Sequence, residues 1–296
     1  MDRPSIESLD NGVVRRVTLL RIACVVLCIP LTFSACNESG TAPSLGTYAY
    51  PNLPSSGQCR GGSQGGPSGV INGEVSSDGL RYHVRTPSNY DPTFAHPLLM
   101  VYAAAGQSGL ASETITGLTP VGTAAGFLVV YADHQSLSLS TIEQLAGIPA
   151  SVANTWCIDE RKVYLTGHSD GGTVALAMAV LAGTKHMPAA IAPSAAGWTG
   201  KDLETYQCRD PLPVMIMHSA NDNLFRGWGV QTVAWWAACN RCDVAKTKNV
   251  EGGCLAYQQC AAGGATLYCE GTGHHRDWPK LNRMMLEFFL HPETLL

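Results

Sequence analysis

The stretch RKVYLTGHSDGGTVALAMAVLAG, residues 161–183, decides the fold. It opens with RKVYLT, which has the apolar character of a buried strand, and it closes with an apolar run of helical length. Between the two lies GHSDG, a GxSxG pattern centred on Ser169. A serine in a tight turn between strand and helix projects its hydroxyl at the carboxyl edge of a sheet, and the glycines make room for the crossing. The pattern alone also occurs by chance in glycine-rich loops, but the flanking strand and helix favour a nucleophile at Ser169.

Strand-like and helix-like segments alternate along the rest of the chain, without a repeat of fixed period. Continuously apolar strands indicate burial on both faces, and the alternation indicates a mostly parallel sheet with helices on both sides. We therefore predict an α/β fold. The expected strands lie near 79–86, 97–103, 127–132, 161–166, 189–193, 213–218 and 265–269, and the expected helices near 140–155, 172–183, 227–239 and 279–290.

A serine hydroxyl needs a histidine to take its proton and a carboxylate to hold that histidine. In this architecture the three follow in the order serine, acid, histidine. Asp222 follows the apolar strand PVMIMH, and two histidines follow the last strand in GTGHHRDWP. We favour His274 over its neighbour His275 because it directly follows Gly273. His168, inside the serine motif, is expected to line the site rather than act as the base.

The composition narrows the classes of function. The chain has 296 residues, of which 45% are apolar and 14% charged, and a formal net charge of −4. This is ample material for a large core and excludes intrinsic disorder for most of the chain. The weak acidic charge gives no reason to expect nucleic acid as a partner.

The beginning of the chain has the pattern of an export signal. Basic residues within 15–21 are followed by the apolar run 22–33, which is too short to span a bilayer comfortably. The run ends in Phe33-Ser34-Ala35-Cys36, which resembles the bacterial lipobox, where the cysteine is lipidated after cleavage. We expect lipid on Cys36 and attachment to an outer or cell-surface membrane. An ordinary cleavage site near Ala35 and an uncleaved anchor are the alternatives.

These observations divide the chain into parts. We predict a lipoprotein signal over residues 1–35 and a flexible tether, rich in Gly, Ser and Pro, over residues 36–67. The α/β catalytic domain is expected over residues 68–296. Cys59, near the end of the tether, is placed to attach that end to the domain.

The cysteines fit an exported protein. Of the eleven, three lie in or beside the signal, which leaves eight, an even number that suggests up to four disulfides. A redox or zinc role for Cys239 and Cys242 is less favoured, because the pair follows a helix and no second pair lies at metal-binding spacing.

Four segments together resemble a known family. They are RKVYLTGHSDGG, PVMIMHSANDN, GTGHHRDWP and, at 100–109, MVYAAAGQSG. The likeness is to the exported polyhydroxybutyrate depolymerase and feruloyl esterase group of α/β-hydrolases, over roughly residues 79–292. It implies an α/β-hydrolase fold without a large separate lid domain, no metal or cofactor, and Ser169, Asp222 and His274 as the catalytic residues.

The resemblance also suggests an oxyanion hole, the pair of N–H groups that stabilises a developing negative charge. The family usually has HGCGQ after the first central strand, and this chain has Ala103-Ala104-Ala105-Gly106-Gln107. A backbone N–H serves here, so we assign those of Ala105 and Asp170. Trp278 flanks the acyl group or lies in the core or at the rim. The resemblance further suggests the disulfides Cys157–Cys208 and Cys242–Cys260.

The sequence therefore favours an exported serine esterase that hydrolyses carboxylic esters through an acyl-enzyme. The expected substrates are polyhydroxyalkanoates or feruloylated or acetylated polysaccharides. The protein would be attached to the cell envelope by lipid or secreted. The alternatives are a non-catalytic binding lipoprotein on a hydrolase scaffold and a peptidase or acyltransferase with the same triad.

Overall fold

The computed structural model describes residues 42–50, 59 and 64–295. The predicted signal segment and Cys36 lie outside the described residues. Among the described residues, none of the helices combines the length and apolar character needed to cross a bilayer. The fold below is that of the unit Pro43–Leu296.

The domain is built on one ten-stranded sheet with the strand order β1-β2-β4-β3-β5-β6-β7-β10-β9-β8. In the sheet, the six neighbouring strands β4, β3, β5, β6, β7 and β10 pair in parallel. The strands on either side of these six pair antiparallel. This confirms the predicted α/β class and a mostly parallel centre. The strands are β1 Val70–Val75, β2 Arg81–Arg85, β3 His96–Tyr102, β4 Leu128–Ala132, β5 Ile158–His168, β6 Ala190–Ser194, β7 Val214–Ser219, β8 Asp243–Val250, β9 Cys254–Gln258 and β10 Thr266–Gly271.

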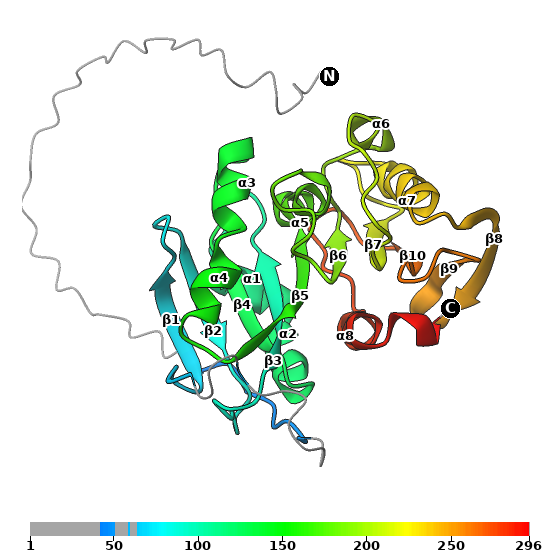
Figure 1. Cartoon of the computed structure of the whole chain (residues 1–296). Helices are drawn as coiled ribbons and strands as arrows, with labels where there is room; N and C mark the ends of the chain where they lie inside the picture. Colours follow the sequence, from blue (N-terminus) through cyan, green and yellow to red (C-terminus); the bar gives the residue numbers. More distant parts are fainter. Residues whose placement is uncertain (1–41, 51–58, 60–63, 296) are drawn as a thin grey trace, which may run out of the picture. The chain divides into compact units, whose positions relative to one another are not determined.

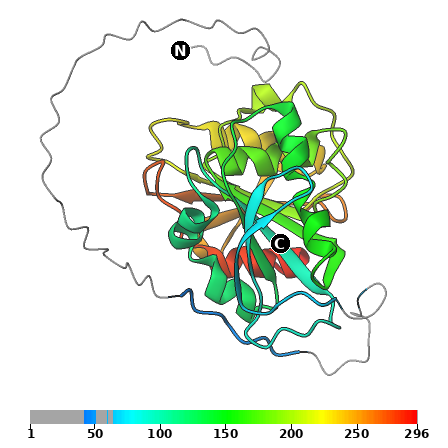
Figure 2. The same ribbon diagram turned by 90° about the vertical axis from the view of Figure 1, so that its left-hand side faces the viewer.

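Helices cover both sides of this sheet, with α5 and α7 above it and α2 and α8 below it in the view of Figure 1. Figure 2 shows the same layers after a quarter turn. The α-helices of the described residues are α1 Gly109–Thr116, α2 Leu118–Ala124, α3 Leu139–Leu145, α4 Ile148–Ala153, α5 Asp170–Val180, α6 Gly200–Leu203, α7 Trp228–Cys239 and α8 Asn282–Leu290, and their 3₁₀ turns are η2 Glu251–Gly253 and η3 Pro292–Leu295.

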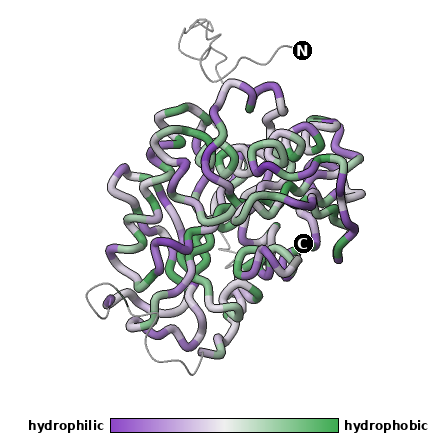
Figure 3. The backbone as a smooth tube through the Cα atoms, turned by 45° about the vertical axis from the view of Figure 1, so that its right-hand side comes forward, coloured by the Kyte–Doolittle hydropathy of each residue, from purple (hydrophilic) through white to green (hydrophobic). Residues whose placement is uncertain are grey.

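The core lies on the two faces of the central strands. Every residue of β3 is buried, which explains its unbroken apolar sequence HPLLMVY. Alternate side chains such as Leu99 and Val101 join one apolar cluster with Phe288 of α8. Figure 3 shows the hydrophobic stretches mainly toward the middle of the domain and the hydrophilic ones in its outer loops. This packing fixes the carboxyl ends of the parallel strands along one edge.

Part of the predicted tether differs from the expectation, because residues 43–50 lie against the domain. The N–H of Gly46 donates to Thr123 Oγ1 at 2.7 Å. The rings of Tyr48 and Tyr50 pack edge to face at 4.8 Å between centroids, and both contact His96 at the start of β3. The flexible-tether prediction is therefore wrong for this stretch, because its two tyrosines supply the apolar surface that the Gly/Ser/Pro-rich remainder lacks.

Four disulfides use all eight cysteines of the domain, as the even count suggested: Cys59–Cys157, Cys208–Cys239, Cys242–Cys260 and Cys254–Cys269. The pair Cys242–Cys260 agrees with the resemblance. The pair Cys157–Cys208 is wrong. Cys157, just before β5, instead pairs with Cys59. Because α6 packs on α7, Cys208 lies close to Cys239 at the end of α7 and pairs with it.

Candidate active site

Ser169 lies at the turn from β5 into α5, as the motif predicts. Its φ of +56° is in the left-handed region, which costs a non-glycine residue about 1–3 kcal/mol. A Cβ at Gly171 would overlap the carbonyl oxygen of Tyr102, and one at Gly172 would lie 2.5 Å from the carbonyl oxygen of Ser194. These glycines are therefore required by the close crossing of α5 over the neighbouring strand ends.

A continuous chain of hydrogen bonds runs from Ser169 to a buried carboxylate. The Ser169 hydroxyl and Nε2 of His275 are 2.9 Å apart, and Nδ1 of His275 lies 2.8 Å from Oδ2 of Asp222. The three residues follow β5, β10 and β7, which end at the same edge of the sheet. The structure thus brings together the predicted Ser169 and Asp222.

The histidine in this chain is His275, so the preference for His274 is corrected. His274 is exposed, and its N–H donates to Oδ2 of Asp277 at 2.7 Å. The N–H of Asp277 returns to the His274 carbonyl oxygen at 3.0 Å. This small turn directs His274 outward and the next residue inward. The sequence preference was based on the position of His274 next to Gly273. That position does not determine which of the two histidine side chains points into the site.

Asp222 is fully buried, yet it stays ionised. Burial alone would raise its pKa, but hydrogen bonds from His275 and from the N–H groups of Phe225 and Leu224 outweigh burial and lower the pKa. The Phe225 ring also packs edge-on against the His275 imidazole at 4.8 Å between centroids. The carboxylate can therefore hold one tautomer of His275, with Nε2 free to accept a proton from Ser169.

His168 links the serine turn to the histidine loop. Its Nε2–H donates to the carbonyl oxygen of His275, and its Nδ1 accepts from the Ser194 hydroxyl at 3.0 Å. Burial lowers the pKa of His168 to about 4, so the ring is neutral at pH 7. His168 lines the cavity, as predicted, and it also fixes the backbone of the neighbouring histidine, a contact that sequence reasoning missed.

The two predicted oxyanion residues lie near Ser169, Ala105 as a fellow lining residue of the cavity described below and Asp170 as the next residue in the chain. Ala105 is in a turn closed by a 3.0 Å bond from the Gln107 N–H to the Ala104 carbonyl oxygen, with Gly106 at a φ of +71°. Asp170 is the first residue of α5, where N–H groups have no partner within the helix. The helix dipole adds positive potential there. The assignment of these two N–H groups to an oxyanion hole therefore stays a prediction.

A small cavity opens beside Ser169 and His275. Its volume is about 270 Å³, and it lies between the turn after β3 and α1. The lining residues are Tyr102, Ala104, Ala105, Gln107, Ser112, Ile115, Thr116, His168, Ser169, Leu224, His275 and Arg276.

A second cavity of about 730 Å³ shares Ile115 and Arg276 with the first, so the two are neighbours. Most of its wall comes from residues 270–281, the stretch that carries His275. Trp278 lines this second cavity and not the first, and its Nε1–H donates to Asn282 at 2.7 Å. Of the two predicted places for Trp278, the structure favours the core or rim, because the half-buried ring packs against the core and lines the second cavity.

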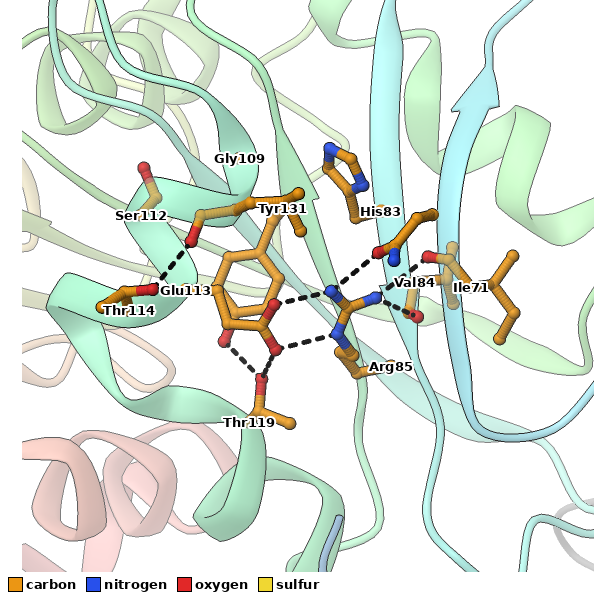
Figure 4. Close-up of polar contacts among 12 residues, drawn as sticks. Ile71, His83, Val84, Arg85, Gly109, Ser112, Glu113, Thr114, Thr119 and Tyr131 are labelled. Carbon is orange, nitrogen blue, oxygen red and sulfur yellow. Dashed lines mark hydrogen bonds and ion pairs between the residues drawn. The ribbon is translucent and has the colours of Figure 1, made fainter. Parts of the chain in front are cut away.

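A buried ion pair fixes α1, which forms one wall of the first cavity. Arg85 Nε and Nη2 donate to the two carboxylate oxygens of Glu113 at 2.8 and 2.6 Å. Figure 4 shows the hydroxyl of Thr119 beside the carboxylate oxygen that Arg85 Nε also contacts; the hydroxyl donates to that oxygen at 2.5 Å and lies 3.0 Å from the Tyr131 hydroxyl. The guanidinium also donates to the Ile71 carbonyl oxygen at 2.9 Å.

Sequence reasoning missed both the helix and the pair. The available signal was Arg85 in the predicted strand 79–86, GLRYHVRT, which also carries Arg81. Its partner Glu113 lies in a helix of eight residues that shows little apolar periodicity. No sequence pattern therefore joined the two charges.

Comparisons with known proteins give the fold. No family model matches the sequence, and no curated protein is similar enough to match it. Solved structures do match. An acetyl xylan esterase from Aspergillus awamori is 14% identical with a TM-score of 0.59, and the match covers 76% of this chain and 99% of that one.

Two further structures are similar over most of their length. The fluorophosphonate-binding serine hydrolase F of Staphylococcus aureus is 13% identical with a TM-score of 0.53, over 78% of this chain and 100% of that one. A truncated carbohydrate esterase from gut microbiota is 14% identical with a TM-score of 0.53, over 80% and 99%. At these identities the likeness establishes the α/β-hydrolase fold.

Proposed function

We propose that this protein is an exported carboxylic ester hydrolase that works through Ser169, His275 and Asp222. The observation that carries the proposal is the hydrogen-bond chain from the Ser169 hydroxyl through His275 to the buried Asp222. The arrangement has a nucleophile, a base within 2.9 Å and an orienting carboxylate within 2.8 Å, which is the geometry that activates a serine. The solved structures of similar fold include proteins named as esterases, which supports the same class.

The reaction proceeds by acyl transfer. Ser169 Oγ attacks the ester carbonyl carbon while His275 Nε2 takes the hydroxyl proton, and Asp222 stabilises the imidazolium. The N–H groups of Ala105 and Asp170 hold the oxyanion. The intermediate collapses to an acyl-Ser169 ester, and His275 gives its proton to the departing alcohol. Water then repeats the sequence on the acyl-enzyme and releases the carboxylic acid.

Export is supported by four disulfides, which persist in oxidising compartments. Lipid on Cys36 rests on the sequence pattern of residues 33–36 alone. Among substrates, polyhydroxyalkanoates and feruloylated or acetylated polysaccharides are the candidates. The similar Aspergillus awamori structure is named an acetyl xylan esterase, and the small first cavity suits a short acyl group.

The test is the presteady-state release of p-nitrophenol from p-nitrophenyl acetate by the purified protein. We expect a burst equal to the enzyme concentration, labelling by a fluorophosphonate probe, and loss of both in Ser169→Ala. Ser136→Ala, at an exposed serine, is the matched control and should keep both signals. If the wild type shows no burst and no labelling, the proposal is overturned and a non-catalytic binding protein is favoured.

A further inference from the structure

A histidine outside the triad joins the turn after β3 to the start of α5. His134 lies two residues after the end of β4. Its N–H donates to the carbonyl oxygen of Gln107, in the turn after β3, at 3.0 Å. Its Nε2 lies 3.2 Å from Oδ2 of Asp170, the first residue of α5. A single residue thus contacts two elements that meet beside Ser169.

The contact between His134 and Asp170 is partly sheltered from solvent. The two side chains are 18% and 27% exposed, respectively. Exposed ion pairs contribute little, because water and salt screen them and their side chains lose entropy on pairing. An ionised carboxylate can only accept a hydrogen bond, so Nε2 of His134 donates through its N–H. The bond therefore restrains Asp170 more firmly than a fully exposed pair would.

Asp133, the neighbour of His134, fixes the same segment at a second point. Its Oδ1 accepts from the N–H of Gly109, the first residue of α1, at 2.7 Å. The same oxygen lies 3.5 Å from Nε2 of the buried His83 in β2. The two residues after β4 thus hold the chain between Gln107 and Gly109 at both ends. The turn after β3 is therefore fixed from outside as well as by its own hydrogen bond.

These contacts bear on the predicted oxyanion hole. Two N–H groups stabilise an oxyanion only when both lie about 2.7–3.1 Å from the same oxygen atom. The predicted donors, Ala105 and Asp170, belong to different elements, the turn after β3 and α5. Their separation therefore depends on what connects these elements. The hydrogen bond from His134 to Asp170 is such a connection, because the backbone of His134 is bonded to the turn.

The charge of Asp170 gives a second reason for the contact. This carboxylate belongs to the residue directly after the nucleophile, where a negative charge opposes the charge that develops on a substrate oxygen. A hydrogen bond from His134 to Oδ2 stabilises the carboxylate in one position and offsets part of that repulsion.

We propose that His134 is a positioning residue for the oxyanion hole, because it holds the turn after β3 and the start of α5 at the separation that the two N–H groups require. This inference rests on the proposed esterase function and on the predicted donors Ala105 and Asp170. His134 acts through Asp170 and not on the substrate, since the cavity beside Ser169 is lined by other residues.

The test measures the hydrolysis of p-nitrophenyl acetate and the inhibition constant Ki of a trifluoromethyl ketone. This ketone adds to an active serine and places an oxyanion in the hole, so its Ki reports on the hole directly. His134→Leu should lower kcat/KM by about 10- to 100-fold and raise Ki by a similar factor, because misplaced donors stabilise the transition state less. The value of kcat should fall with kcat/KM, and KM should stay within about threefold.

Three further variants separate the hydrogen bond from other effects of the substitution. His134→Gln keeps an N–H donor close to the place of Nε2 and should retain at least about a third of the wild-type kcat/KM. Asp170→Ala cuts the same bond from the other side, so adding His134→Leu to it should change kcat/KM by less than about twofold. His186→Leu, at an exposed histidine, should match the wild type.

The outcomes separate this inference from the proposed esterase. If the wild type shows a burst and His134→Leu leaves both kcat/KM and Ki unchanged, the positioning role is overturned and the esterase stands. The role is also overturned if Ki alone is unchanged, or if His134→Gln is as weak as His134→Leu. If His134→Leu does not fold, Asp170→Ala decides, since it should raise Ki by the same factor and an unchanged Ki would overturn the role. No burst and no fluorophosphonate labelling in the wild type would overturn the esterase itself.

Discussion

Ser169 and His275 lie within one hydrogen bond of each other, yet the two regions that hold them are built differently. The serine turn is fixed by the backbone, because α5 crosses the strand ends so closely that Gly171 and Gly172 have no room for a Cβ. The histidine loop, residues 272–281, contains neither helix nor strand. Side-chain hydrogen bonds hold it, from His168 to the His275 carbonyl oxygen and from Asn221 to the Thr272 carbonyl oxygen.

The difference shows which parts of the site are specified by local sequence and which by contacts between distant residues. The serine turn depends on neighbours in the sequence, so a short motif specifies it. The histidine loop depends on contacts between residues far apart, such as His168 and His275, which are separated by 107 positions. A prediction from sequence can therefore choose the wrong neighbouring residue in the loop, as with His274 and His275, more easily than in the serine turn.

The largest expected effect concerns which histidine of the loop is used. His275→Ala should lower kcat/KM for p-nitrophenyl acetate by about 10⁴-fold or more, because the base between Ser169 and Asp222 is lost. His274→Ala should stay within about threefold, since His274 is exposed and outside the hydrogen-bond chain. Steady-state kinetics of both variants decide this. Equal losses would mean that the loop as a whole, rather than His275, carries the function.

The next effect compares a glycine of the turn with one of the loop. Gly171→Ala should destabilise the protein by about 3 kcal/mol or more, because its Cβ would overlap the backbone of Tyr102. Gly273→Ala should cost less than about 1 kcal/mol. Its Cβ would lie 3.0 Å from the side chain of Asp277, in a loop that can adjust. Urea unfolding followed by circular dichroism measures both, and similar losses would contradict the proposed difference in rigidity.

The smallest effect concerns His168, which joins the two regions. Its pKa is about 4 in the folded protein, against 6.5 for an unperturbed histidine, so the unfolded chain binds the extra proton first. The neutral, buried His168 therefore makes a contribution to the free energy of unfolding that is complete above pH 6.5 and is lost as the pH falls toward 4. The full loss is about 3 kcal/mol, from about 1.4 kcal/mol per pH unit.

His168→Leu removes the titrating group, so its unfolding free energy should fall less than that of the wild type between these pH values. Chemical denaturation at a series of pH values measures the difference. The buried His83, His96 and His218 also have lowered pKa values, but they remain in both proteins and cancel. His186→Gln, at an exposed histidine, is the control and should keep the wild-type slope. Identical slopes for His168→Leu and wild type would contradict the assignment.

The same contrast explains how much of the fold the sequence predicts. The central strands were predictable because burial on both faces makes them continuously apolar, and the serine turn because its glycines are sterically required. The edge strand β8, DVAKTKNV, is mostly exposed and carries no apolar pattern, so it was not predicted. The short helix α1 was missed for a related reason, since its contact with the sheet depends on the ion pair between Arg85 and Glu113.

The candidate site divides in the same way. Asp222 could be placed because it lies in the loop just after the strongly apolar strand β7. The choice between His274 and His275 depends on a turn closed by the Asp277 side chain, which the preceding glycine does not indicate.

Residues 43–50 pack at the end of β3 that is opposite the candidate site. Tyr48 and Tyr50 contact His96 at the first residue of β3, while Tyr102 at the other end of the same strand lines the cavity. With a rise of about 3.3 Å per residue, these two edges are roughly 20 Å apart. Residues 43–50 therefore pack against the domain at a distance from Ser169.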